Sequence, residues 1–305
     1  MLVLSPADVC RRGFYYHKNL PNFFDGELNK QKIDSFKKYY GSSPHVVAAL
    51  WSDLQATEGC NIPDKYKSEK GFFEFCIVLH FLWAYPKNAD ILADSFSVCK
   101  RLVEGGNLWR WVEQIAKLKA KAIVWPEAYY NDPDSPIYIV TVDGVDYRTW
   151  ERKHPTYSKD TKSMSHKFKH GALKYEVAVD VFLSKIVWTN GPFLGGVHDG
   201  TIFWKALRDK IPPGKKVITD RVYGNQSEAE DHKKLALPNP LDDAELAKFK
   251  ARAKCRHEAV NGRFHNFSAL QQTYRHAQDK HEFVFTSIAV MVQKQMDMGN
   301  KLFDV

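Results

Sequence analysis

The chain has 305 residues, of which 44% are hydrophobic and 26% are charged. This composition is that of a folded globular protein with a sizeable core, and it excludes a largely disordered chain. The formal charge of +8 and the pI of about 9.0 favour polyanionic partners, nucleic acid first.

The cysteines and the apolar stretches exclude further classes. The five cysteines are scattered without a Cys-x-x-Cys pair, which argues against a zinc site built on paired thiolates and suits a reducing compartment. The N-terminus lacks a charged leader, so we predict no signal peptide. The most apolar stretch, residues 72–85, is interrupted by Glu74 and His80 and is shorter than the roughly 20 residues that cross a bilayer. We therefore expect a buried helix there and no membrane partner.

Residues 1–126 are predicted to form an all-helical N-terminal domain. Residues 107–121 carry apolar side chains at helical spacing, among them Leu108, Trp111 and Ile115. Residues 89–106 have the rhythm of a helix-turn-helix, with an ordinary pair of packed helices as the alternative. Trp109 and Trp111 are interpreted as core residues rather than as platforms for base stacking.

A connector rich in proline and aspartate, residues 125–136, marks the boundary to a second domain at 127–305. The pattern then changes to strands, with one helix between them at 199–211 and two helices after them, a long one from Asp242 and a last one at 282–296. The predicted strands are residues 137–142, 172–182, 185–193, 215–220 and 235–238. This order predicts an α/β fold with a mixed sheet and flanking helices.

Two aspartates stand at the ends of predicted strands. Asp143 follows the first strand, although Asp143-Gly144 is also a strong hairpin signal. Asp220 ends the strand at 215–220, where a simple turn before Tyr223 is the alternative. Ligands in open α/β sheets lie at the carboxyl ends of strands, and Mg²⁺ prefers oxygen ligands. If the two strands are neighbours, these carboxylates could share a divalent cation.

A third acid, Glu258, lies at the rim of the apolar face of the long helix. Lys254, Asn261 and His265 share its side of that helix. Such a face, rich in hydrogen-bond donors around an acid, would suit phosphate binding. The alternative is a solvated helix residue paired with Lys254. For Asp199, which follows His198, we favour a helix N-cap over a metal ligand.

Basic residues are concentrated directly after Asp143. Eight lysines and arginines lie between Arg148 and Lys174, and only Glu151 and Asp160 oppose them. Such a cluster would bind phosphates with little sequence reading, and a solvated basic loop is the alternative. The residues predicted to contact DNA are Arg148, Arg152, Lys153, Lys167, Lys169, Lys254 and Asn261.

Five motifs in this order resemble the catalytic domain of a DDE-type transposase of the PIF/Harbinger-like group, a DDE superfamily endonuclease domain. They are VDG, SHKFKHGALKYEVAV, WTNGPFLGGVHDGTIF, ITDRVYG and RHEAVNGRF. The resemblance implies a ribonuclease H-like fold and two Mg²⁺ or Mn²⁺ ions held by Asp143, Asp220 and Glu258. It also implies hydrolysis of a DNA phosphodiester and transfer of the freed 3′ end to target DNA by a two-metal mechanism.

The same resemblance implies a nuclear protein with DNA as its partner, and it leaves open a Myb-like DNA-binding partner protein and a homodimer. The chain departs from the family pattern at Val222, where glycine is common, and at His265, where lysine is usual. These departures favour an alternative, a catalytically decayed or domesticated transposase-derived DNA-binding protein. A different phosphoryl-transfer hydrolase is a second alternative, which the basic stretch after Asp143 disfavours.

Overall fold

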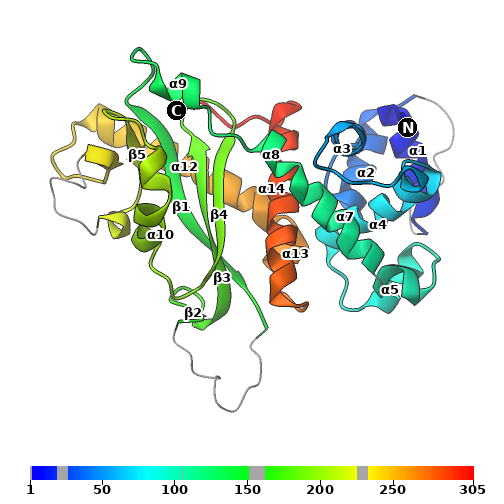
Figure 1. Ribbon diagram of the computed structural model, residues 1–305. Coiled ribbons are helices and arrows are strands. Elements are labelled where there is room, and N and C mark those ends of the chain that lie inside the picture. The colour runs from blue at the N-terminus through cyan, green and yellow to red at the C-terminus, as the bar shows by residue number, and fades with distance from the viewer. Residues whose placement is uncertain (1, 19–26, 105, 151–161, 225–232) are drawn as a thin grey trace. The chain divides into compact units, whose positions relative to one another are not determined.

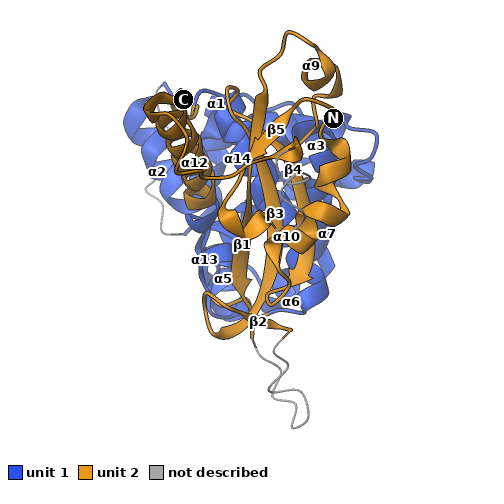
Figure 2. Cartoon of the chain, turned by 90° about the vertical axis from the view of Figure 1, so that its left-hand side faces the viewer, with its two compact units in different colours: residues 1–122, 264–272, 276–299 blue, residues 123–263, 273–275, 300–305 orange. Residues whose placement is uncertain are grey.

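The computed structural model describes residues 2–18, 27–104, 106–150, 162–224 and 233–305 (Figure 1). These residues form two compact units (Figure 2). Unit 1 comprises residues 1–122, 264–272 and 276–299, and unit 2 comprises residues 123–263, 273–275 and 300–305.

Unit 1 is helical. Side chains at the N-caps begin several of its helices, because Ser5, Asn29, Ser43 and Asn88 each accept a hydrogen bond from a backbone N–H of the first turn. Its elements are α1 (Pro6–Tyr16), α2 (Lys30–Tyr40), α3 (Pro44–Ala56), η1 (Asp64–Tyr66), α4 (Glu69–Ala84), α5 (Ala89–Ser95), α6 (Lys100–Glu104), α7 (Gly106–Lys117), α8 (Lys119–Ala122), α13 (Ser268–Gln271), η4 (Gln278–Lys280) and α14 (His281–Asp297).

The core of unit 1 is built around α4, α7 and α14. The apolar stretch at 72–85 forms most of α4 and is largely buried, as predicted. Trp111 of α7 is also buried and packs 5.7 Å from Trp51, ring centre to ring centre, which confirms its interpretation as a core residue. Ser287 of α14 donates a hydrogen bond to the carbonyl of Val112 at 2.8 Å. No helix within the described residues is long and apolar enough to span a bilayer.

The units do not divide where the sequence suggested. The predicted boundary lies between residues 126 and 127, whereas the contacts divide after Ala122. The last helices, α13 and α14, group with the N-terminal helices and not with the predicted second domain. The segment with helix-turn-helix rhythm forms α5 and α6, of seven and five residues. Lys100 of α6 forms ion pairs with Asp90 and Glu104.

Unit 2 is a mixed sheet with helices on both faces. Its elements are α9 (Glu127–Asn131), β1 (Tyr138–Arg148), β2 (Met164–Ser165), β3 (His170–Asp180), β4 (Ile186–Leu194), α10 (Asp199–Lys205), η2 (Leu207–Lys210), β5 (Lys216–Ile218), η3 (Arg221–Tyr223), β6 (Leu235–Ala236) and most of α12 (Ala244–His265). The strand order is β2-β3-β1-β5-β6, and β4 also pairs with β3. The pairs β1–β3 and β3–β4 are antiparallel, whereas β1–β5 and β5–β6 are parallel.

Alternation along β1 separates the two faces of the sheet. Val142 packs in a cluster with Phe203 of α10. The hydroxyl of its neighbour Thr141 is hydrogen-bonded to Nδ1 of His257 on α12, at 2.8 Å. Thus α10 covers one face and α12 covers the other, which confirms the predicted α/β class with a mixed sheet and flanking helices.

The first strand does not turn back at Asp143-Gly144. It pairs with β3 without interruption from Val140 to Arg148, so the hairpin alternative is wrong. Pairing on both sides of residue 143 requires an extended backbone, and a two-residue hairpin turn would break it. Asp143 is therefore a strand residue whose side chain points to one face of the sheet.

Candidate active site

Asp143 lies on β1, and Asp220 lies at the equivalent position two residues beyond the end of the neighbouring parallel strand β5. Thr141 of β1 is in register with Ile218 of β5, and each aspartate follows two residues later. Because parallel strands run in the same direction, both carboxylates lie at the same level along this strand pair, where β5 ends and β1 continues. They line one small hollow together with Glu258 of α12. The structure thus brings together the three acids that the sequence predicted.

Asp143 is partly buried and well anchored. Its Oδ1 accepts a hydrogen bond from the N–H of Gly144 at 2.9 Å, and its Oδ2 accepts one from the side-chain amide of Asn261 at 3.3 Å. Burial, followed by the charges of Glu258, Asp199 and Asp220, raises the pKa of Asp143 to about 7. The repulsion among these acids would be relieved by a bound cation, a pattern typical of functional sites.

Lys254 occupies part of this site, because its ammonium group forms an ion pair with the Asp220 carboxylate. The sequence predicts Lys254 as a DNA contact, whereas here its ammonium group binds a carboxylate of the site. Although the three acids line one hollow, no three His, Cys, Asp or Glu side chains of the described residues are grouped closely enough to hold a metal ion without a rearrangement. A divalent cation at Asp220 would therefore have to displace the Lys254 ammonium.

The residues present fit a Mg²⁺ or Mn²⁺ ion in two respects. The hollow has a volume of about 20 Å³, roughly the room that one water molecule or ion needs. Its acids supply only hard oxygen ligands, which these ions prefer. The carboxylates Asp143, Asp220 and Glu258 are the residues that could hold such an ion.

His257 is a site neighbour whose role the sequence reasoning missed. It is buried, and burial lowers the pKa of its imidazole to about 4, so the ring is neutral at physiological pH. Its hydrogen bond to Thr141 ties α12 to β1 two residues before Asp143. The signal that could have identified it is its position, because His257 is the one polar residue within the apolar stripe of α12 and directly precedes Glu258.

Asp199 is not a helix N-cap as predicted. His198 occupies the N-cap position of α10 and makes no capping side-chain hydrogen bond. Asp199 is the first residue of α10 and accepts a hydrogen bond from Lys174 Nζ at 2.6 Å. Lys174 is buried, so it cannot join the basic cluster to which the sequence assigned it. The partners of Lys174 lie on other elements of unit 2, so the spacing of residues in the sequence could not identify them.

The other predicted DNA contacts differ in accessibility. Arg148 is exposed at the end of β1, with its guanidinium 4.6 Å from the centre of the Phe168 ring. Lys167 and Lys169 are exposed in the turn that joins β2 to β3. Asn261 is buried against Asp143, whereas Arg152 and Lys153 lie outside the described residues.

The two departures from the family pattern have different structural settings. Val222 lies in the 3-10 turn η3, and it is not among the described residues with positive φ. The strain expected for valine at a position that favours glycine is therefore absent. His265 is the last residue of α12 and is partly buried.

Glu176 is a second buried acid of unit 2 that sequence reasoning did not single out. It lies on β3 opposite Gly144 of β1, and its Oε2 accepts a hydrogen bond from Trp188 Nε1 at 2.9 Å. Burial raises the pKa of its carboxyl to about 7. Among the described residues, its Oε1 has no hydrogen-bond partner. No local pattern distinguishes this glutamate from a solvated one on a strand.

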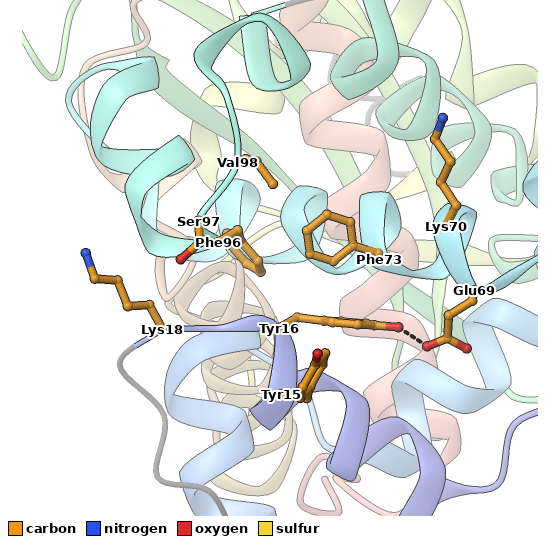
Figure 3. Close-up of a pocket in the computed structure, with 9 residues that line it drawn as sticks. All are labelled: Tyr15, Tyr16, Lys18, Glu69, Lys70, Phe73, Phe96, Ser97 and Val98. Carbon is orange, nitrogen blue, oxygen red and sulfur yellow. Dashed lines mark hydrogen bonds between the residues drawn. The ribbon is translucent and has the colours of Figure 1, made fainter.

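Unit 1 has a separate pocket of about 530 Å³ (Figure 3). Tyr16, Phe73 and Phe96 contribute aromatic walls. Its charged residues are already paired in part, because Glu69 binds Arg12 and Tyr16, and Lys18 binds Asp94 at 2.7 Å. The pocket therefore presents no strong charge by which a ligand class could be inferred.

Comparisons with protein-family models, with curated proteins and with solved structures gave no match. The functional argument therefore depends on the geometry of unit 2 and on the sequence motifs.

Proposed function

We propose that the chain is a metal-dependent DNA endonuclease and strand transferase of the DDE transposase type, similar to the PIF/Harbinger group. One observation carries this proposal. Asp143 on β1 and Asp220, just beyond the end of the parallel strand β5, occupy equivalent positions, and Glu258 of α12 lines the same hollow. Three acids that lie far apart in the sequence and share one hollow are what a two-metal nuclease needs.

The fold supports the proposal at a coarser level. The resemblance implies a ribonuclease H-like domain, and unit 2 has the mixed sheet and the flanking helices that such a domain requires. The first acid lies on a central strand, the second follows the end of its parallel neighbour and the third lies on the long helix α12. We therefore propose that unit 2 is a ribonuclease H-like domain.

In this proposal Asp143, Asp220 and Glu258 would hold two Mg²⁺ or Mn²⁺ ions, and the hollow as it stands has room for one of them. When bound, such ions activate an attacking oxygen and stabilise the leaving oxygen of a phosphodiester. The chain's own residues then have separate tasks. Asn261 orients the Asp143 carboxylate through its amide, and Arg148, Lys167 and Lys169 present exposed charge to DNA phosphates. Nuclear localisation, a Myb-like partner and a homodimer belong to the same proposal.

One observation favours a second candidate, a transposase-derived protein that binds DNA without cutting it. The Lys254 ammonium already neutralises Asp220, which a catalytic metal would require. If this ion pair persists when DNA is bound, the two-metal site cannot assemble. The two candidates therefore differ in whether a divalent cation displaces Lys254.

The test is a nicking assay on supercoiled DNA with Mg²⁺ or Mn²⁺. We expect the wild type to cut, and we expect Asp143→Asn, Asp220→Asn and Glu258→Gln to be folded and inactive. Asp209→Asn is the matched control, because Asp209 is exposed and forms an ion pair with its neighbour Arg208, away from the three acids. Equal cutting by the wild type and the triad variants would refute the enzyme. Binding of DNA by all of them without cutting would support the second candidate.

A further inference from the structure

On the face of the sheet covered by α10, a group of buried charges lies directly behind Asp143. Lys174 of β3 is in register with Asp146 of β1, and its Nζ lies 3.8 Å from Asp146 Oδ1. The same Nζ donates hydrogen bonds to Asp199 Oδ1 at 2.6 Å and to the carbonyl of Val197 at 2.9 Å. One buried lysine thus connects β1, β3 and the start of α10.

The Asp199 carboxylate is seated on the backbone beside Asp143. A β-carbon at Gly144 would lie 2.7 Å from Asp199 Oδ1 and 2.8 Å from its Cγ, closer than side-chain atoms pack. The absence of a side chain at Gly144 is therefore what allows Asp199 to approach the strand. Since Lys174 holds Asp199 in this place, the Asp199 carboxylate packs against β1 at Gly144, the residue whose N–H donates a hydrogen bond to Asp143 Oδ1.

The same group reaches the turn that carries two of the predicted DNA contacts. Ser165 donates a hydrogen bond to Asp146 Oδ2. Its hydroxyl oxygen accepts hydrogen bonds from the N–H groups of Lys167 and Phe168, each at 3.2 Å. A continuous polar chain therefore runs from this turn through Asp146 and Lys174 to Asp199.

We propose that Lys174 is a positioning residue that holds Asp199 against Gly144 and thereby fixes Asp143 in the orientation that binds a divalent cation. This inference depends on the proposed function, because it assigns a metal ligand role to Asp143. Residues of this kind orient the ligands of metal sites without touching the metal, and their loss typically lowers metal affinity about 10- to 100-fold.

Removal of the lysine separates positioning from simple electrostatics. Lys174→Met deletes a positive charge near the site, so Coulomb attraction alone would strengthen the binding of a cation. A positioning role predicts the opposite, a loss of affinity. The same measurement tests whether Asp199 is itself a metal ligand. If it is, Lys174→Met would free Asp199 to bind the ion, and the affinity for the ion would rise.

The experiment measures Mn²⁺ affinity by isothermal titration calorimetry on the full chain. We expect Lys174→Met to bind Mn²⁺ about tenfold more weakly than the wild type. The matched control is Lys215→Met, because Lys215 is also a buried lysine of unit 2 but donates to the carbonyls of Asp132 and Ser135. That variant should lose stability and keep the affinity of the wild type within about twofold. An affinity of Lys174→Met equal to or above that of the wild type would overturn the inference.

If Lys174→Met does not fold, Gly144→Ala decides the question, because it moves Asp199 without changing any charge. We expect a similar fall in Mn²⁺ affinity. Gly262→Ala is its control, since a β-carbon at Gly262 of α12 would meet no atom of another described element within 4 Å. Unchanged affinity in Gly144→Ala would overturn the inference.

The outcomes separate this inference from the proposed function. A wild type that binds Mn²⁺ but cuts no DNA would refute the enzyme, while the affinities of the variants still decide the role of Lys174. A wild type that cuts DNA, with variants that bind Mn²⁺ normally, would refute positioning alone. A wild type that binds no Mn²⁺ would refute both.

Discussion

Replacement of Asp143 by asparagine should stabilise the metal-free protein at alkaline pH. The pKa of Asp143 rises from an ordinary value of 3.8 to about 7, mainly because the carboxylate is desolvated and also because Glu258, Asp199 and Asp220 repel it. A shift of this size corresponds to at most about 4 kcal/mol of unfavourable free energy for the ionised form. Since the side chain keeps some contact with solvent, we expect a gain of about 2 kcal/mol in Asp143→Asn at pH 8.

The sign of the pH dependence follows from linkage. The folded state binds the proton of Asp143 more tightly than the unfolded state, so the wild type loses stability as pH rises from about 4 to about 7. The advantage of Asp143→Asn should therefore be absent near pH 4, grow up to about pH 7 and stay constant above it. Saturating Mn²⁺ should reverse the order, because only the wild type gains binding free energy.

Equilibrium urea unfolding in EDTA at pH 5 and pH 8 measures this difference. Asp209→Asn serves as the control for loss of an exposed carboxylate and should differ from the wild type by less than about 0.5 kcal/mol at either pH. An Asp143→Asn variant that is no more stable than the wild type at pH 8, or equally stabilised at both pH values, would refute the reasoning about the buried charge.

Three further predictions concern the surroundings of Asp143. Glu176→Gln should be more stable than the wild type above pH 7 by up to about 3 kcal/mol, and equally stable near pH 4, because burial raises the pKa of Glu176 from 4.5 to about 7. Urea unfolding across this pH range measures the two stabilities. A difference in stability that does not change with pH would contradict the prediction. Lys254→Met should bind Mn²⁺ more tightly than the wild type by calorimetry, since the ion no longer has to displace the ammonium from Asp220. The double variant Lys167→Ala/Lys169→Ala should weaken DNA binding. The fall of log affinity with log salt concentration should become less steep, by about 0.9 for each lost phosphate contact. An unchanged slope would mean that this turn does not face DNA.

The sequence predicted the sheet because its strands carry strong local signals. β3 lies within the predicted run at 172–182 apart from its first two residues, and it is buried along almost its whole length, as expected of a central strand. The edge strands are less predictable. The predicted strand at 235–238 pairs only through Leu235 and Ala236, because edge strands depend on their one neighbour more than on their own composition.

The two aspartates could be paired from the sequence because residues that follow equivalent positions of neighbouring parallel strands lie side by side, although β1 continues beyond Asp143 rather than ending there as predicted. Local sequence could not decide between a hairpin and a continuous strand at Asp143-Gly144, since both use the same residues. The structural reason for Gly144 is the close approach of Asp199, which lies 55 residues later in the chain and on another element. Tertiary contacts of this kind leave no local signal.

Charge was the least predictable feature. Lys174 and Lys167 belong to one basic run in the sequence, yet Lys174 is buried between Asp146 and Asp199 whereas Lys167 is exposed. The alternation of a strand places every second residue on the covered face. The sequence could not show that carboxylates of β1 and α10 lie next to the lysine on that face. Likewise, Lys254 shares a helix face with Glu258 as predicted, but its partner is Asp220.

The most direct test of the account is the position of a bound metal ion. Crystals of the protein grown with Mn²⁺ should show an anomalous scattering peak between the carboxylates of Asp143 and Asp220, with the Lys254 ammonium displaced from Asp220. Absence of the peak from this position, or an intact ion pair between Lys254 and Asp220 in crystals that bind Mn²⁺ elsewhere, would contradict the proposed active site.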